Sequence, residues 1–211
     1  MNKIRYYLFD EVVLHNKKDD FWVVLHGNVL NLTPLMKDRY DHWNSNLEYL
    51  LAFGGKDLSH FFEETLMPKT EASPVTGRPR LLFPPILETA LSEMCKTKGK
   101  LWSQDPMYHI GRLTRRDRRV RIINTLTGTT QLMKVCDEDT IYDIQCKYRQ
   151  LYNHNAGSYV WLKFSNRGQC DGKLNLKGTL DENGLVEEEN CNYDLPPPSI
   201  WLYYTNDVTI A

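Results

Sequence analysis

Net charge is almost absent from this sequence. Its 26 lysine and arginine residues are balanced by 27 acidic residues, which leaves a formal charge of −1 over 211 residues. A balanced chain produces no global field that would attract polyanions or anionic lipid surfaces. We therefore expect no nucleic-acid partner and no membrane partner.

Long apolar runs and paired cysteines are also missing. No stretch approaches the ~20 apolar residues of a membrane span, and residues 1–5 open no apolar segment of signal-peptide length. The cysteines are odd in number, widely spaced and without a Cys-x-x-Cys pair: Cys95, Cys136, Cys146, Cys170 and Cys191. Free thiols fit a reducing compartment, so the sequence predicts a cytoplasmic protein.

Catalytic motifs are absent as well. The sequence contains no nucleophile elbow, no phosphate-binding loop and no His-Glu-x-x-His. Gly54-Gly55 is too short to surround a phosphate, and the acids at residues 137–139 precede a predicted helix, where they suit the helix dipole. The sequence therefore predicts a protein that is not an enzyme.

The first structured stretch runs from Tyr6 to Phe62. Residues 22–25 form a short apolar run, His26-Gly27-Asn28 is a turn signal, and residues 29–32 alternate apolar and polar side chains. This pattern predicts a β-hairpin, preceded by one or two helical turns at residues 10–16. Residues 22–33, together with the Gly-Gly-Lys-Asp-Leu-Ser-His-Phe-Phe of residues 54–62, resemble the cytochrome b5 family.

The resemblance implies a haem-binding fold, in which two histidines ligate the iron. The family's His-Pro-Gly-Gly is missing, since residues 39–45 read Arg-Tyr-Asp-His-Trp-Asn-Ser. His42 lies one residue out of register, and the place of the second ligand falls on Met67. Tyr, His and Met all ligate haem iron, so one hypothesis is an unusual haem site that uses Tyr40, His42 or Met67. The other hypothesis is that Tyr40 and His42 are loop residues and that Met67 only packs against its neighbours. The sequence predicts no metal beyond haem iron.

Residues 68–110 differ in composition from the stretches on either side. Prolines interrupt the segment repeatedly, the apolar run at residues 81–86 contains two of them, and residues 101–108 are aromatic and irregular. A proline-interrupted run does not form a central strand. The sequence predicts an ordered connector that docks on neighbouring surfaces.

The second structured stretch covers residues 120–151. Residues 120–126 and 130–135 are predicted strands on either side of a Thr127-Gly128 turn, and Thr140 caps a helix in a capping box with Asp143. Four apolar residues at helical spacing form the predicted buried stripe: Ile141, Ile144, Tyr148 and Leu151. Strand, turn, strand and capped helix is the first half of a β-grasp.

Residues 119–206 resemble ubiquitin. The opening hairpin, the start of the helix, a third strand at residues 159–164 and a last strand at residues 200–204 carry the resemblance. A conjugated modifier needs a terminal Gly-Gly whose carboxylate can be activated, whereas this sequence ends Asp-Val-Thr-Ile-Ala. The resemblance implies a ubiquitin-like domain used for binding or structure, without ubiquitin-type conjugation.

A run of arginines lies at the start of this second stretch. Six fall between residues 112 and 121, relieved only by Asp117. Guanidinium groups bind phosphates and carboxylates, but RNA recognition would need stacking aromatics or a known module beside the run, and neither is there. Two interpretations stay open: binding to an acidic protein surface such as a microtubule lattice, or a solvated strand-edge face that limits aggregation. The predicted partner-binding residues are Arg112, Arg115, Arg116, Arg118 and Arg119.

These observations predict an α+β protein of two small domains. They are an N-terminal cytochrome b5-like domain at residues 1–67, the connector at residues 68–110 and a C-terminal ubiquitin-like β-grasp at residues 111–211. This order resembles a family of cytochrome b5 domain-containing proteins of the ciliary axoneme. The resemblance implies a non-enzymatic structural or regulatory component that associates with radial spokes and coordinated beating, and whose partners are axonemal proteins of the cilium. The alternative is a haem-binding redox sensor or electron carrier with a non-standard haem site.

Overall fold

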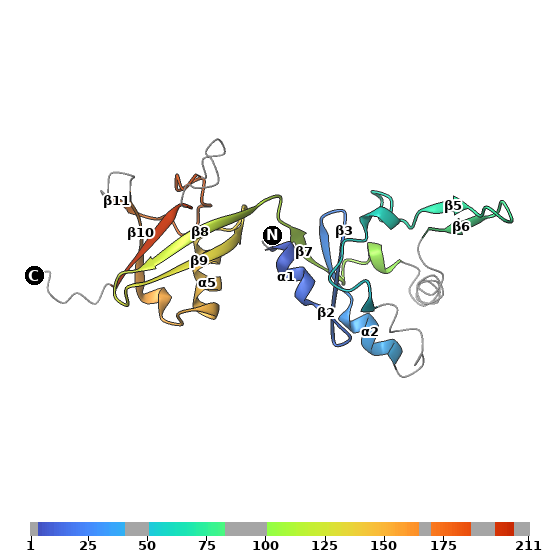
Figure 1. Cartoon of the computed structure of the whole chain (residues 1–211), viewed down its shortest axis with the longest axis horizontal. Coiled ribbons are helices and arrows are strands. Elements are labelled where there is room, and N and C mark those ends of the chain that lie inside the picture. Colours follow the sequence, from blue (N-terminus) through green and yellow to red (C-terminus); the bar gives the residue numbers. More distant parts are fainter. Residues whose placement is uncertain (1–3, 41–50, 83–100, 165–169, 187–196, 205–211) are drawn as a thin grey trace, which may run out of the picture. The chain divides into compact units, whose positions relative to one another are not determined.

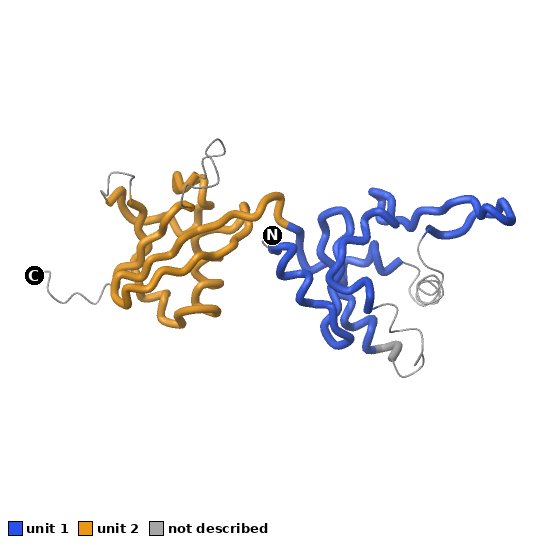
Figure 2. Tube along the Cα trace, in the orientation of Figure 1, with its two compact units in different colours: residues 1–113 blue, residues 114–211 orange. Residues whose placement is uncertain are grey.

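The structure is a computed structural model that describes residues 4–40, 51–82, 101–164, 170–186 and 197–204. The chain divides into two compact units, Met1–Leu113 and Thr114–Ala211 (Figure 2). Both units combine strands and helices, so the predicted α+β class is confirmed. Within the described residues, no helix is both long and apolar enough to span a membrane.

The first unit is built on a five-stranded mixed sheet of order β1-β7-β4-β3-β2 (Figure 1). Its strands are β1 (Tyr6–Tyr7), β2 (Asn16–Lys17), β3 (Asp20–Leu25), β4 (Asn28–Asn31) and β7 (His109–Leu113). Among its described residues, the α-helices are α1 (Phe9–Leu14) and α2 (Thr33–Tyr40), and the short 3₁₀ helices are η1 (Ser59–Phe61) and η2 (Trp102–Gln104). A separate two-stranded sheet pairs β5 (Thr70–Ala72) with β6 (Pro79–Leu81).

The predicted hairpin is confirmed as β3–β4. His26 and Gly27 both have positive φ, 45° and 74°, as the two central residues of a type I′ turn require. The turn sets the register, in which Val24 pairs with Val29 and Leu25 with Asn28. Val24 and Leu25 are fully buried, so the apolar run at residues 22–25 supplies the centre of the first unit.

The predicted domain boundaries at residues 67 and 110 do not hold. β7 runs parallel to β1 and antiparallel to β4, so residues 109–113 complete the sheet of the first unit. Trp102 and Tyr108 are buried in the same core as Phe62, whose ring lies edge-on to Trp102 at a centroid separation of 5.5 Å. The described parts of the predicted connector therefore belong to the first unit, which ends at Leu113.

The second unit has a five-stranded sheet of order β11-β10-β12-β8-β9. Its strands are β8 (Asp117–Asn124), β9 (Thr129–Cys136), β10 (Tyr159–Phe164), β11 (Cys170–Lys173) and β12 (Ser199–Tyr204), and its helices are α5 (Ile141–Leu151) and η3 (Ala156–Ser158). β8 and β9 form a hairpin, and the last strand, β12, inserts parallel to β8 at the centre. This is the β-grasp arrangement that the strand and helix order predicts. The closer likeness to ubiquitin stays a prediction from the sequence.

Helix α5 begins as predicted. Thr140 Oγ1 accepts a hydrogen bond from the Asp143 amide, and Asp143 Oδ2 accepts one from the Thr140 amide, which completes the capping box. Ile141, Ile144 and Tyr148 are buried against the sheet core, which includes Val120 and Ile122 of β8. Leu151 is 67% exposed, so its place in the buried stripe was wrong; it lies in the last turn, past the edge of the core.

Candidate functional site

The arginine run does not form one continuous surface, because β8 divides it between the two faces of the sheet. Side chains alternate along a strand, and in β8 the positions of Arg118, Val120 and Ile122 are buried while Asp117 and Arg119 are exposed. Arg118 is in phase with two apolar residues. That alternation is visible in the sequence and was the signal that would have placed Arg118 inside.

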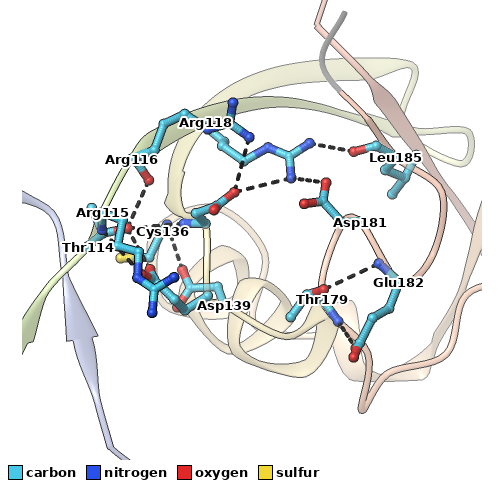
Figure 3. Close-up of polar contacts among 12 residues, drawn as sticks. Thr114, Arg115, Arg116, Arg118, Cys136, Asp139, Thr179, Asp181, Glu182 and Leu185 are labelled. Atoms are coloured by element: carbon cyan, nitrogen blue, oxygen red, sulfur yellow. Dashed lines mark hydrogen bonds and ion pairs between the residues drawn. The ribbon is translucent and has the colours of Figure 1, made fainter. Parts of the chain in front are cut away.

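The Arg118 side chain is fully buried and holds three elements together. Its Nη1 lies 2.5 Å from Asp181 Oδ1 and 3.4 Å from Asp137 Oδ1, and its Nη2 donates to the Leu185 carbonyl at 2.5 Å (Figure 3). Its Nε is buried without a hydrogen-bond acceptor among the described residues. A buried guanidinium with two carboxylates and a carbonyl is a structural group. Its predicted role in partner binding is therefore wrong.

The loop that Arg118 contacts is fixed by a second set of hydrogen bonds. The Thr179 amide donates to Glu182 Oε2 at 2.8 Å, and the Glu182 amide donates to Thr179 Oγ1 at 3.3 Å (Figure 3). Leu180, between these residues, is fully buried in the core of the second unit. Arg118 thus connects β8 to a loop that is itself anchored.

The neighbouring arginines face the acids that follow β9. Arg116 Nη2 lies 3.4 Å from Asp137 Oδ1, and the Arg115 amide donates to Glu138 Oε1 at 3.2 Å. The Arg115 guanidinium is 4.0 Å from the same carboxylate, and its side chain is 87% exposed. Residues 137 and 138 therefore neutralise part of the run within the fold. The side chains of Arg115, which precedes β8, and of Arg119 in β8 are exposed.

A buried ion pair lies next to this acidic loop. Asp139 Oδ2 accepts from the Cys136 amide at 2.9 Å and from Lys147 Nζ at 2.8 Å. Burial raises the pKa of the Asp139 carboxyl above its ordinary value, while Lys147 acts in the opposite direction. Lys147 Nζ also lies 3.7 Å from Cys136 Sγ. Through Asp139, the arrangement connects Lys147 of α5 to the end of β9. Among the described residues, no group of three or more His, Cys, Asp or Glu side chains is placed to hold a metal ion.

Arg112 belongs to the first unit. It lies in β7, its side chain is exposed, and its amide donates to the Arg5 carbonyl at 2.9 Å. It is thus the one predicted partner-binding residue that lies outside the second unit.

The candidate haem ligands are not brought together among the described residues. Tyr40 is the last residue of α2, but its side chain and all of His42 lie outside the described part of the chain. Met67 is 43% exposed, and its carbonyl accepts from the Glu63 amide at 2.8 Å, which closes a turn. An exposed thioether in a surface turn does not fit an axial ligand in an enclosed haem pocket. The described residues therefore do not provide the predicted ligand set.

Several histidines of the first unit have structural partners instead. His15 Nδ1 lies 2.6 Å from Asp20 Oδ2, and its ring stacks on Trp22 at 3.5 Å. His26 Nε2 lies 3.0 Å from the Phe62 carbonyl, and His109 Nε2 lies 3.0 Å from the Ser103 carbonyl. His60, the histidine of the second cytochrome b5-like motif, is exposed beside Phe61.

Comparison with known proteins agrees with the architecture. Residues 9–114 match the family model "Cytochrome b5-like Heme/Steroid binding domain", which also places residues 68–110 inside the first unit. Over 218 aligned positions the chain is 36% identical to "Cytochrome b5 domain-containing protein 1" of Xenopus laevis, covering 97% of this chain and 96% of that protein. The Homo sapiens protein of the same name is 35% identical over 97% of this chain and 92% of its own length.

More distant similarities cover smaller parts of the chain. A cytochrome b5 of Brassica oleracea var. botrytis is 41% identical over 56 residues, which is 26% of this chain and 39% of that protein. The solved structure of the cytochrome b5 of Ostreococcus tauri virus 2 covers 51% of this chain and 95% of its own, with 19% identity and a TM-score of 0.28. The relatives aligned over nearly the whole length decide the assignment: the chain belongs to the family of cytochrome b5 domain-containing protein 1.

Proposed function

We propose that this protein is a non-enzymatic structural and regulatory component of the ciliary axoneme, associated with radial spokes and coordinated beating. The observation that supports this most is that 97% of the chain aligns with cytochrome b5 domain-containing protein 1, the kind of protein whose resemblance implies an axonemal role. Its partners would be axonemal proteins, in radial spokes or on doublet microtubules, rather than nucleic acid, a membrane or a conjugation enzyme.

Exposed arginines of the second unit are the first candidates for contact with an acidic axonemal surface. Arg115 and Arg119 are exposed, and each presents a guanidinium that can pair with a carboxylate in two parallel hydrogen bonds. Arg118 is excluded because its side chain has no solvent exposure. The proposed contact therefore uses fewer arginines than the sequence run contains.

The test is retention on axonemes. The tagged full-length chain is expressed in ciliated cells, and isolated axonemes are washed with rising salt. The double variant Arg115→Ala, Arg119→Ala should elute at lower salt than wild type, because exposed ion pairs are screened within about 10 Å at 0.1 M salt. Arg149→Ala, which removes an exposed arginine of α5, is the matched control and should elute with wild type. If the double variant elutes at the same salt concentration as wild type, the proposed contact through Arg115 and Arg119 is refuted. If the wild-type chain is absent from axonemes, the proposed axonemal location is refuted.

Haem binding is the second candidate, because the matching family is described as a haem or steroid binding domain. A haemin titration of the full chain, followed by absorption in both redox states, tests it. Tyr40→Phe, His42→Ala and Met67→Leu are titrated in parallel. Because Met67 is exposed, Met67→Leu should leave any Soret band unchanged. A saturable Soret band that is lost in His42→Ala or Tyr40→Phe would support a haem site that uses that residue. If no Soret band forms in either redox state, the haem-binding function is excluded.

A further inference from the structure

A small hairpin in the first unit has no core of its own. Strands β5 and β6 form a sheet of two strands that, among the described residues, pairs with no other strand, and neither strand contains a buried side chain (Figure 1). Val75, in the loop that joins them, is 90% exposed. An isolated two-stranded hairpin is only marginally stable, so this one can open locally at small cost while the rest of the unit stays folded.

The loop of this hairpin is closed by hydrogen bonds around Ser73. The Ser73 amide donates to the Arg78 carbonyl at 2.9 Å, and the Gly77 amide donates to the Ser73 carbonyl at 2.8 Å. The Ser73 hydroxyl oxygen accepts from the Thr76 amide at 3.4 Å. The Ser73 hydroxyl group therefore lies where the two strands meet the loop.

The register of the hairpin places an arginine opposite Ser73. Glu71 pairs with Arg80, and their side chains form an ion pair at 2.6 Å, so opposite side chains on this face are in contact. Ser73 and Arg78 are the next pair on the same face, because side chains alternate along each strand. The Arg78 side chain is exposed and has no ion-pair partner among the described residues. A negative group on the Ser73 hydroxyl would therefore meet an arginine that can bind it.

The residue that follows Ser73 is Pro74, and serine or threonine followed by proline is the dipeptide that proline-directed kinases phosphorylate. The sequence contains one other such dipeptide, Thr33-Pro34. Thr33 begins helix α2, and its Oγ1 accepts from the Phe21 amide at 2.9 Å. A kinase binds its substrate segment in an extended conformation, which the hairpin loop can adopt on opening and the start of a packed helix cannot. The structure therefore distinguishes two sites that the dipeptide alone does not.

We infer that Ser73 is a phosphorylation site for a proline-directed serine/threonine kinase and that Arg78 binds the attached phosphate. The Ser73 hydroxyl oxygen attacks the γ-phosphorus of MgATP, the bond from that phosphorus to the β,γ-bridging oxygen breaks, ADP leaves, and the hydroxyl proton passes to the catalytic aspartate of the kinase. Phosphoserine carries a charge of about −1.5 to −2 at pH 7. The phosphate offsets the positive charge of the hairpin, in which Lys69, Arg78 and Arg80 outnumber Glu71. Phosphorylation thus converts a basic, weakly held hairpin into a neutral, closed one.

The site is tested on the purified full-length protein, incubated with MgATP and either a cyclin-dependent or a mitogen-activated protein kinase. Peptide mass spectrometry should find at least about tenfold more phosphate on Ser73 than on Thr33, because only the hairpin opens at small cost. Pro74→Ala should lower the initial rate at Ser73 by about tenfold or more, since the kinase selects the proline side chain. Val75→Ala, at the neighbouring exposed position, is the matched control and should be phosphorylated at the wild-type rate.

Two further measurements test the contact with Arg78, after phosphorylation to completion. Peptides covering residues 69–82 should exchange amide hydrogens about two- to fivefold more slowly than in the unmodified protein, the effect of one exposed ion pair. Phosphorus-31 NMR should give a lower phosphoserine pKa in wild type than in Arg78→Gln, because the guanidinium stabilises the dianion. Arg78→Gln should lose both effects. Arg149→Gln, an exposed arginine of the second unit, is the matched control and should keep them.

Different outcomes would overturn the two parts of this inference. No phosphate on Ser73 with either kinase, or as much phosphate on Thr33 as on Ser73, would overturn the modification site. Equal exchange rates and an equal phosphoserine pKa in wild type and Arg78→Gln would overturn the contact with Arg78. Every measurement uses the purified chain, so the result does not depend on the axonemal location.

Discussion

Arg118 is the residue at which a structural role and a binding role make opposite predictions. Replacing it with methionine keeps most of the side-chain length but removes the guanidinium that contacts Asp181, Asp137 and the Leu185 carbonyl. If Arg118 bound a partner, the free protein would be unaffected. If it holds the loop at residues 179–185 to β8, the second unit loses stability.

The magnitude follows from the burial of each partner. Hydrogen bonds to charged groups contribute about 1.5–3 kcal/mol each, and breaking a buried ion pair typically costs about 3–5 kcal/mol. Here the carboxylates regain water easily, because the side chains of Asp181 and Asp137 are 56% and 26% exposed. The Leu185 carbonyl, in a residue that is only 4% exposed, loses its donor outright. We therefore expect Arg118→Met to lower the free energy of unfolding of the second unit by about 2–3 kcal/mol.

Denaturant unfolding combined with hydrogen exchange by mass spectrometry measures this effect. Peptides covering residues 117–136 and 179–185 should exchange faster in Arg118→Met, whereas peptides of the first unit should not change. Arg119→Met, at an exposed position of the same strand, is the control and should stay within about 0.5 kcal/mol of wild type. Equal stability of the two variants would refute the structural role, since it would mean that desolvation of the guanidinium cancels its contacts.

Three further predictions concern buried groups. Trp102→Ala should lower the free energy of unfolding of the first unit by about 3–5 kcal/mol in denaturant unfolding, because Trp102 is in its core. A change below about 1 kcal/mol would show that residues 101–108 are a connector and not part of that core. Burial raises the pKa of Tyr148, so above pH 10 the unfolded chain loses the phenol proton before the folded chain does. Wild-type stability should therefore fall by up to about 1.4 kcal/mol per pH unit relative to Tyr148→Phe until the folded pKa is reached, and parallel pH profiles would contradict this. Lys147→Met should cost about 2 kcal/mol at pH 7 because it leaves the Asp139 carboxylate buried without its cation. That cost should vanish as the pH falls below the raised pKa of Asp139, and a pH-independent loss would assign it to packing.

Local features of the fold were predictable because short-range chemistry specifies them. The His26-Gly27 turn and the Thr140–Asp143 capping box each depend on residues within a few positions of one another, whereas the predicted alternation in β4 is not seen, because Val29 and Leu30 are both fully buried. The same holds for the strand, turn, strand and helix order of the second unit. In these segments, propensity, patterning and turn chemistry favour the same conformation.

The error in the domain boundaries concerns partners that are distant in the sequence. Residues 101–113 show no periodicity of their own, yet Trp102 contacts Phe62 and β7 pairs with β1, about a hundred residues earlier in the chain. Met67 was selected by its position relative to a family motif, and the structure places its side chain at the surface. A motif count gives the spacing of residues but not the direction in which a side chain points.

The sequence by itself determined the two-part α+β organisation, the central hairpin, the capped helix and the family to which the chain belongs. Only the tertiary structure decided where the first unit ends and that Arg118 is an internal ion-pair residue. The physical reason is the range of the interactions. Turns and caps are set by neighbouring residues, whereas sheet order and burial are set by pairings between strands that the chain brings together only on folding.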